Sequence, residues 1–168
     1  MQKVLLAVEG IRPDGKAFNY ALELCKRMRA ELNVLEVINP RKYLGYLKKL
    51  GDGAQRMRQY FEDSMVAATF AEAGEHEMAE QLREQAMENF RKLLPQSEKV
   101  GVPCHLTMKS GRTDREIIDY VNAHRDIVVT IYDGEEGRWG FGGNRRKRRR
   151  VPPAIRKNIS TPLVVING

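Results

Sequence analysis

The sequence contains little cysteine, and this excludes the architectures that depend on cysteine. Cys25 and Cys104 are the only two cysteines among 168 residues. Two isolated cysteines do not form the disulfide framework of a small secreted domain, and they do not supply the clustered ligands of a structural zinc site. Each lies in an apolar-patterned segment, so we expect two buried free thiols.

The sequence also lacks a long apolar run. No stretch approaches the ~20 residues that a helix needs to cross a bilayer, so no membrane insertion is expected. The opening MQKVLLAVEG is apolar only briefly, because Glu9 and Gly10 end it. It has neither the apolar core nor the cleavage site of a signal peptide. A cytoplasmic location is therefore the prediction.

The sequence has little net positive charge outside the segment 145–150. The formal net charge is +7, and the six consecutive basic residues at 145–150 supply all but +1 of it. A protein that coats nucleic acid spreads its lysines and arginines over a face, so the overall charge gives no indication of that class. The question of partners is confined to the segment GFGGNRRKRRRVPP at 140–153.

The residue sets of common catalytic sites are missing. The sequence has no nucleophile–base–orienter arrangement and no GxGxxG fingerprint. The histidines His76, His105 and His124 lie in separate segments without metal-ligand spacing. We therefore expect no dedicated enzyme, while slow hydrolysis of a bound nucleotide stays open.

Five segments have the pattern of strands, at 3–8, 32–38, 102–109, 126–132 and 161–166. The runs at 3–8 and 126–132 are apolar without alternation, as in strands buried on both faces, whereas 102–109 alternates, and helical patterns lie between the strands. Strands that alternate with helices in this way predict an α/β fold with a five-stranded, parallel, doubly wound sheet. The length suits a single domain over 1–168.

The segment 41–99 reads as helical and enlarges the connection between the second and third strands. It is rich in good helix formers from about residue 56, Gly74 and Glu75 divide it, and Pro95 is expected to end its last helix. An extra helical layer over the sheet and a partner or dimer surface both fit this pattern. Further on, Thr113 and Glu116 match a capping box, which predicts a helix from about Asp114.

A binding site is expected at the carboxyl ends of the first and fourth strands. Open α/β sheets bind ligands where the strand order reverses, and the first strand commonly lies beside the fourth at that point. The carboxyl end of the first strand is Ala7-Val8-Glu9-Gly10, and that of the fourth is Thr130-Ile131-Tyr132-Asp133-Gly134. The Gly/Arg-rich loop 134–151 continues from the fourth strand, and its glycines and arginines suit a phosphorylated ligand.

Three stretches resemble the universal stress protein family. KVLLAVEGIRPDGKAFNYALELCKRMRAELNVLEVI is similar to the family's opening strand, helix and second strand. SGRTDREIIDYVNAHRDIVVT resembles its later helix and fourth strand, and NISTPLVVI resembles its closing strand. The resemblance implies a regulatory stress-response protein with an adenine nucleotide alpha hydrolase-like fold of strand order 3-2-1-4-5. It also implies a homodimer formed through the C-terminal strand.

The resemblance further implies a nucleotide-binding motif that has diverged. Binding members carry G-x-x-G, nine residues and then G-[S/T] after the fourth strand. Here Ile131 stands at the first glycine position, Gly134 matches the second, and Arg149 and Arg150 stand at the final pair. A second alignment takes Gly134 and Gly137 as the glycine pair, and it does not restore the motif either.

Two further positions follow from the same resemblance. Glu9 replaces the aspartate that follows the first strand in the family, and it keeps a carboxylate able to accept from a ribose hydroxyl. Val37 matches the second-strand position that faces adenine in binding members. The candidate ligand residues are Ala7, Val8, Glu9, Val37, Thr130, Ile131, Gly134, Gly137, Arg149, Arg150 and Val151.

Two functional hypotheses stay open. In the first, the chain binds ATP or another phosphorylated ligand with its diverged motif, and Mg²⁺ is expected only together with ATP. In the second, it binds no nucleotide and acts as a dimeric interaction module whose basic run 145–150 docks an acidic protein or a nucleic acid, with strongly salt-dependent affinity. The basic run also fits a solvated loop without a ligand, or a nuclear signal.

Overall fold

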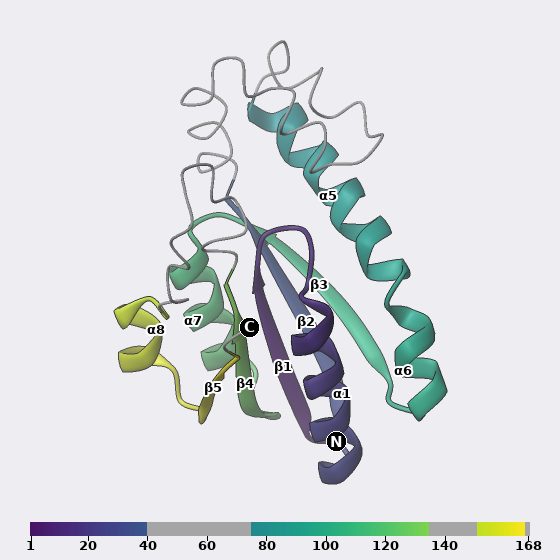
Figure 1. The fold of residues 1–168 in the computed structure, drawn as a ribbon. Helices are drawn as coiled ribbons and strands as arrows, with labels where there is room; N and C mark the ends of the chain where they lie inside the picture. Colours follow the sequence, from purple (N-terminus) through teal and green to yellow (C-terminus); the bar gives the residue numbers. More distant parts are fainter. Residues whose placement is uncertain (40–74, 135–150, 167–168) are drawn as a thin grey trace, which may run out of the picture.

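The fold is a five-stranded parallel sheet between two layers of helices, as seen in the computed structural model of the chain (Figure 1). The structure describes residues 1–39, 75–134 and 151–166. The sheet has the order β3-β2-β1-β4-β5, which confirms the predicted architecture. Its strands are β1 (Lys3–Glu9), β2 (Glu31–Ile38), β3 (Cys104–Ser110), β4 (Ile127–Asp133) and β5 (Leu163–Val165).

The solid apolar runs form the centre of this sheet because both of its faces are covered. In β1, every residue from Val4 to Val8 is fully buried. One face packs against α1 (Gly15–Met28), α5 (Glu75–Arg91) and α6 (Leu94–Val100). The other face packs against α7 (Thr113–Ala123) and α8 (Pro153–Asn158). Successive side chains of each strand therefore enter two separate apolar clusters.

The helices after β2 differ in one detail from the prediction. Residues 40–74, the first part of the expected helical segment, lie outside the described residues, whereas α5 and α6 confirm helix in its last part. Pro95 was expected to end the last helix, and this is wrong, because α5 ends at Arg91 and Pro95 lies in the first turn of α6. The first turn tolerates proline because its N–H groups have no partner within the helix.

The predicted capping box of α7 is also not formed. The helix begins at Thr113 with Arg112 as its N-cap, and no side chain caps it. The Glu116 carboxylate lies over Gly111 instead, where an added Cβ would meet its Oε1 at 2.9 Å. The inner face of the helix buries Ile117 and Val121 in the sheet cluster, and the partly buried Ile118 packs against it.

A buried amide fastens α5 to the loop that follows β1. Asn89 is 7% exposed, and its Nδ2 donates to the carbonyl oxygen of Ile11 at 2.9 Å. Gln85, one turn earlier, donates in turn to the Asn89 Oδ1 at 3.1 Å. The loop at the carboxyl end of β1 is thereby tied to a helix from the distant part of the chain.

Replacing Asn89 with alanine is expected to lower the free energy of unfolding by about 1–3 kcal/mol, because the Ile11 carbonyl would stay buried without this donor. Glu88→Ala, on the exposed side of the same helix, is the matched control and is expected to change it by less than about 0.5 kcal/mol. Urea denaturation of both variants measures the difference. Equal stabilities would show that the amide does not anchor the loop.

Candidate functional site

The candidate site is the seam between β1 and β4 at their carboxyl ends, which we call the β1–β4 seam. The strand order reverses there, because β1 has β2 on one side and β4 on the other. In the parallel register Ala7 lies beside Tyr132 and Val8 beside Asp133. On the other side of β1, Glu9 lies beside Val37. The seam therefore brings together residues from three strands that are far apart in the sequence.

A tyrosine side chain closes the seam on the α7 side. Tyr132 is 2% exposed and donates its hydroxyl to the Glu9 Oε2 at 2.9 Å. Tyr132 is level with Ala7, two residues before Glu9 on the neighbouring strand. The phenol ring must therefore lean along the strands toward their carboxyl ends to reach this carboxylate. Its hydroxyl therefore donates to the half-buried Glu9 carboxylate, the group that the sequence analysis predicted to contact a ligand.

Gly134 leaves the space into which this ring leans. A Cβ added at Gly134 would lie 2.8 Å from Tyr132 Cε1 and 3.1 Å from its hydroxyl oxygen. Real Cβ atoms do not approach other atoms so closely, and the ring is too buried to move aside freely. Gly134 is thus needed here for the tyrosine, whatever its role toward a ligand.

The other side of the seam is held by a carboxylate at the start of α1. Asp133 is 1% exposed, and its Oδ2 accepts from the backbone N–H of Asp14 at 2.7 Å. Asp14 is the N-cap residue of α1, whose first turn contains no acidic side chain. A carboxylate at a helix N-terminus is stabilised by the free N–H groups and by the helix dipole. Asp133 therefore occupies the position at which α1 attracts an anion.

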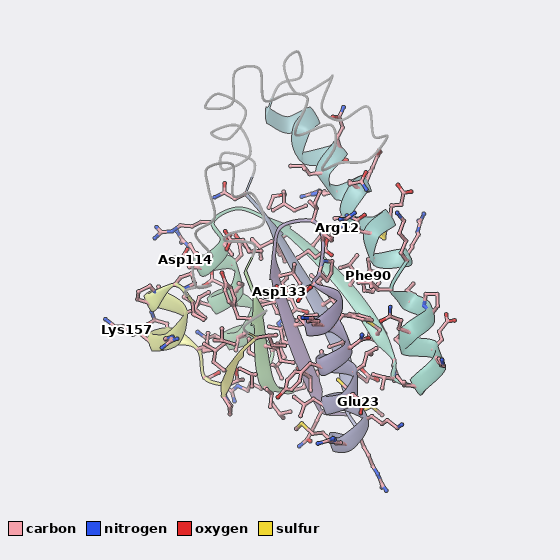
Figure 2. The ribbon with its side chains drawn as sticks, viewed as in Figure 1. Arg12, Glu23, Phe90, Asp114, Asp133 and Lys157 are labelled. Carbon is pink, nitrogen blue, oxygen red and sulfur yellow. The ribbon has the colours of Figure 1, made fainter. Side chains whose placement is uncertain are left out.

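Acidic side chains gather around this end of the sheet. Besides Glu9 and Asp133, Glu36 near the end of β2 is fully buried next to Val8. Arg12 lies in the loop after β1, at the end of the sheet where β1 and β4 finish, while Glu23 lies on α1 toward the other end (Figure 2). A phosphorylated ligand would need further positive charge here.

The structure brings several predicted site residues together. Ala7, Val37 and Val151 pack with Tyr132 in one apolar cluster, and Glu9 lies at its polar edge. The fully buried Val8 and Ile131 belong to the cluster on the α1 side. Gly137, Arg149 and Arg150 lie outside the described residues.

Thr130 lies deeper in the sheet than its proposed role suggests. It is fully buried beside Leu5, and its Oγ1 is 2.7 Å from the Oγ1 of Thr161. The reason is that β4 continues to Asp133, so the strand end lies three residues beyond Thr130. Its contact with a ligand stays a prediction.

Sequence reasoning missed Tyr132 and Asp133 as site residues. One signal was available in the sequence. Ile131 stands at the first glycine position of the family motif, and the bulky Tyr132 follows it directly. Among the described residues, no group of three or more histidine, cysteine, aspartate or glutamate side chains is placed to hold a metal ion. In the same parts of the chain, no helix combines the length and the apolar character needed to span a membrane.

Comparison with known proteins identifies a family for most of the chain. Residues 1–130 match the model of the Universal stress protein family. The search of curated proteins found no match. The family match includes Glu9 and Val37 and ends at Thr130, just before the residues that fill the seam.

Solved structures share the fold at low sequence identity. A protein from the universal stress protein family from Burkholderia pseudomallei is 9% identical with a TM-score of 0.58, over 98% of this chain and 96% of that chain. Universal stress protein UspA from Lactobacillus plantarum is 15% identical with a TM-score of 0.54, over 99% and 97%. A universal stress protein family protein from Arabidopsis thaliana, solved with AMP bound, is 14% identical with a TM-score of 0.48, over 99% of this chain and 91% of that chain.

Gly134→Ala is expected to destabilise the fold by about 1–3 kcal/mol, because the new methyl group overlaps the Tyr132 ring. Gly15→Ala is the matched control, since a Cβ there has nothing within 4 Å. The control is expected to be neutral or slightly stabilising, because alanine restricts the unfolded chain. Thermal unfolding of both variants measures the difference, and a G134A variant as stable as G15A would contradict the packing described here.

Proposed function

This chain belongs to the universal stress protein family, and we propose that it is a cytoplasmic regulatory member that binds a phosphorylated, hydroxyl-bearing ligand at the β1–β4 seam. ATP is the candidate ligand, and Mg²⁺ is expected only together with it. The contact between Tyr132 and Glu9 is the observation that carries this proposal. It shows that the Glu9 carboxylate can accept a hydroxyl donor at the reversal of strand order, where open α/β sheets bind their ligands.

The hydroxyl end of the ligand is assigned to Glu9. Its carboxylate already accepts one O–H donor, from Tyr132 at 2.9 Å. A ribose hydroxyl is a donor of the same kind, so it would compete with the phenol hydroxyl for this carboxylate. Val37, beside Glu9 in the register, offers an apolar surface to the base. Displacing the phenol costs its hydrogen bond, and weak binding is therefore expected.

The phosphate end is assigned to the basic run 145–150. The loop that contains it begins after Gly134 and ends before Val151, and both of these residues are buried next to Tyr132 or in its cluster. Consecutive Cα atoms are about 3.8 Å apart, so Arg150 is covalently tethered close to the seam. Arginine side chains donate to phosphate in pairs and would offset the carboxylates gathered there.

Titration calorimetry with adenosine, AMP and ATP tests this assignment. Glu9→Gln is expected to weaken binding on the order of tenfold, because a charge-assisted hydrogen bond is lost. Tyr132→Phe is expected to tighten it about two- to tenfold, because the ligand no longer competes with the phenol hydroxyl. ATP is expected to bind more tightly than adenosine, which lacks phosphates.

Two control variants separate the seam from general effects. Glu23→Gln changes an exposed carboxylate on α1, and Tyr120→Phe removes a hydroxyl that accepts from Asn33 at 3.1 Å on the same face as Tyr132. Both are expected to bind like the wild type. Equal affinities for the wild type and all four variants would contradict the assignment of the hydroxyl contact to Glu9. No binding of ATP, AMP or adenosine at millimolar concentration would contradict the proposal that the chain binds this class of ligand.

A second candidate function is an interaction module without a small ligand. It is favoured by the filled seam, where Ile131 is fully buried and Tyr132 is 2% exposed. In this function the basic run 145–150 docks a nucleic acid or an acidic protein. The chain dimerises through β5, which pairs with β4 at one edge of the described sheet.

Electrophoretic mobility shift at low salt tests the second candidate. Single- and double-stranded nucleic acids are expected to shift with the wild type, and replacing all six basic residues at 145–150 with alanine is expected to abolish the shift. The affinity is expected to fall steeply with salt, because each neutralised phosphate releases a counterion. Sedimentation of the same samples reports the dimer. A shift that survives the six replacements would exclude the basic run as its cause.

A further inference from the structure

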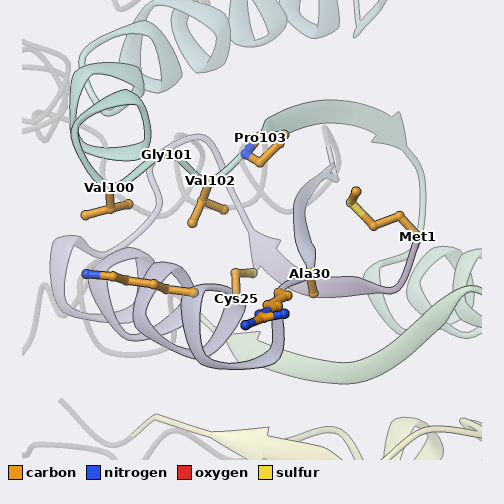
Figure 3. A pocket seen from close by; sticks show the side chains of 9 residues that line it. Met1, Cys25, Ala30, Val100, Gly101, Val102 and Pro103 are labelled. Carbon is orange, nitrogen blue, oxygen red and sulfur yellow. The ribbon is translucent and has the colours of Figure 1, made fainter.

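A separate cavity of about 370 Å³ lies at the amino ends of the strands, opposite the β1–β4 seam. It is formed where Met1 precedes β1, where α1 ends before β2, and where α6 ends before β3 (Figure 3). Its volume falls within the ~300–1,000 Å³ typical of small-molecule sites. The cavity is independent of the proposed function because it shares no residue with the seam.

The walls of this amino-end pocket combine an apolar floor with two cations. Cys25, Ala30 and Val102 form the floor, and each is 6% exposed or less. Lys26 and Arg29 stand at the exposed rim, and no acidic side chain lines the pocket. An apolar floor with a cationic rim selects a ligand that carries an anionic head on a short apolar body.

The backbone at Arg29 has an unusual conformation for an arginine. Arg29 has φ of 54°, and no other non-glycine residue in the described ranges has a positive φ. It is the left-handed C-cap of α1, a position that glycine usually occupies because a Cβ is unfavourable there. An arginine held in this conformation at the rim of a cavity is a strained residue at a candidate site.

The thiol in the floor of the pocket is buried and uncharged. Burial raises the pKa of Cys25 to about 12, so its sulfur stays a neutral thiol near neutral pH. A neutral thiol adds no charge that would repel an anion, and it is a poor nucleophile.

We propose that the amino-end pocket binds a small amphipathic anion, a single carboxylate on a short alkyl or aryl body. The carboxylate lies between the side chains of Lys26 and Arg29, and the apolar body covers Ala30, Val102 and Cys25. The charged hydrogen bonds give selectivity for the anion, and burial of the alkyl or aryl body gives the affinity.

Octanoate, with 1-octanol and octylammonium as probes of the same chain length, tests the pocket by NMR titration of the full chain. Octanoate is expected to bind and to shift the signals of residues around Ala30 and Val102. The other two probes are expected to bind on the order of five- to tenfold more weakly, because they lack the charge that the rim recognises.

Arg29→Gly separates a binding role from a structural one. It removes the guanidinium and relieves the left-handed backbone, so the melting temperature is expected to rise by about 2–4 °C. Octanoate affinity is expected to fall on the order of five- to tenfold, as for Lys26→Gln. Arg27→Gln, in the same exposed last turn but outside the pocket lining, is the matched control and is expected to bind normally.

Three results would overturn the proposal. One is no octanoate binding at millimolar concentration. Another is octylammonium binding as tightly as octanoate. The third is unchanged affinity in both R29G and K26Q, which would assign these cations to the negative end of the α1 dipole alone.

Discussion

The parallel pairing of β1 with β4 is the constraint on which the carboxyl end of this molecule depends. It brings Tyr132 and Glu9, 123 positions apart in the sequence, into hydrogen-bond contact. It also brings Asp133 to the start of α1, 119 positions away. A sheet in which β4 lay beside β3 would leave both contacts unmade. The seam is therefore a property of the strand order and not of any local segment.

Tyr132 and Asp133 are neighbours in β4, and their side chains lie on opposite faces of the sheet. Tyr132 points to the α7 side, where it meets the apolar cluster and Glu9. Asp133 points to the α1 side, where it receives the N–H of Asp14. Because side chains alternate along a strand, the last two residues of β4 fix a ring on one face and a helix start on the other. Any ligand at the seam must be compatible with both.

The central strands β1, β2 and β4 could be predicted from the sequence because they are largely buried on both faces and so need nearly continuous apolar runs. The edge strand β3 was recognised from its alternation instead, and its His105 and Lys109 are exposed. The end of β1 was also predictable, since Gly10 follows it with a positive φ of 115°. The end of β4 was less so, because the apolar pattern stops at Tyr132 while the pairing continues to Asp133. Thr130 lies two residues before even the predicted end of the strand, so it is inside the sheet, and Tyr132 lies at the seam.

Two features could not be predicted from the sequence. One depends on contacts between distant segments, and the other depends on a choice between two nearby contacts. The direction of the Tyr132 ring depends on the space above Gly134 and on an acceptor in another strand. The capping box pattern at Thr113 is present, but the Glu116 side chain lies against Gly111 instead. Local pattern gives the helix and its inner face, and it does not decide which of two nearby partners a carboxylate takes.

The two ends of α1 lead to opposite expectations for anions. At its N-terminus, the site that would attract a phosphate is already taken by the carboxylate of Asp133. Phosphate recognition at the seam must then come from side-chain cations. The negative charge of a ligand would be balanced by the basic run and not by the helix dipole. At its C-terminus the dipole is negative, yet Lys26, Arg27 and Arg29 more than offset it. The end of α1 that a dipole argument alone would exclude is therefore the end at which the described residues favour an anion.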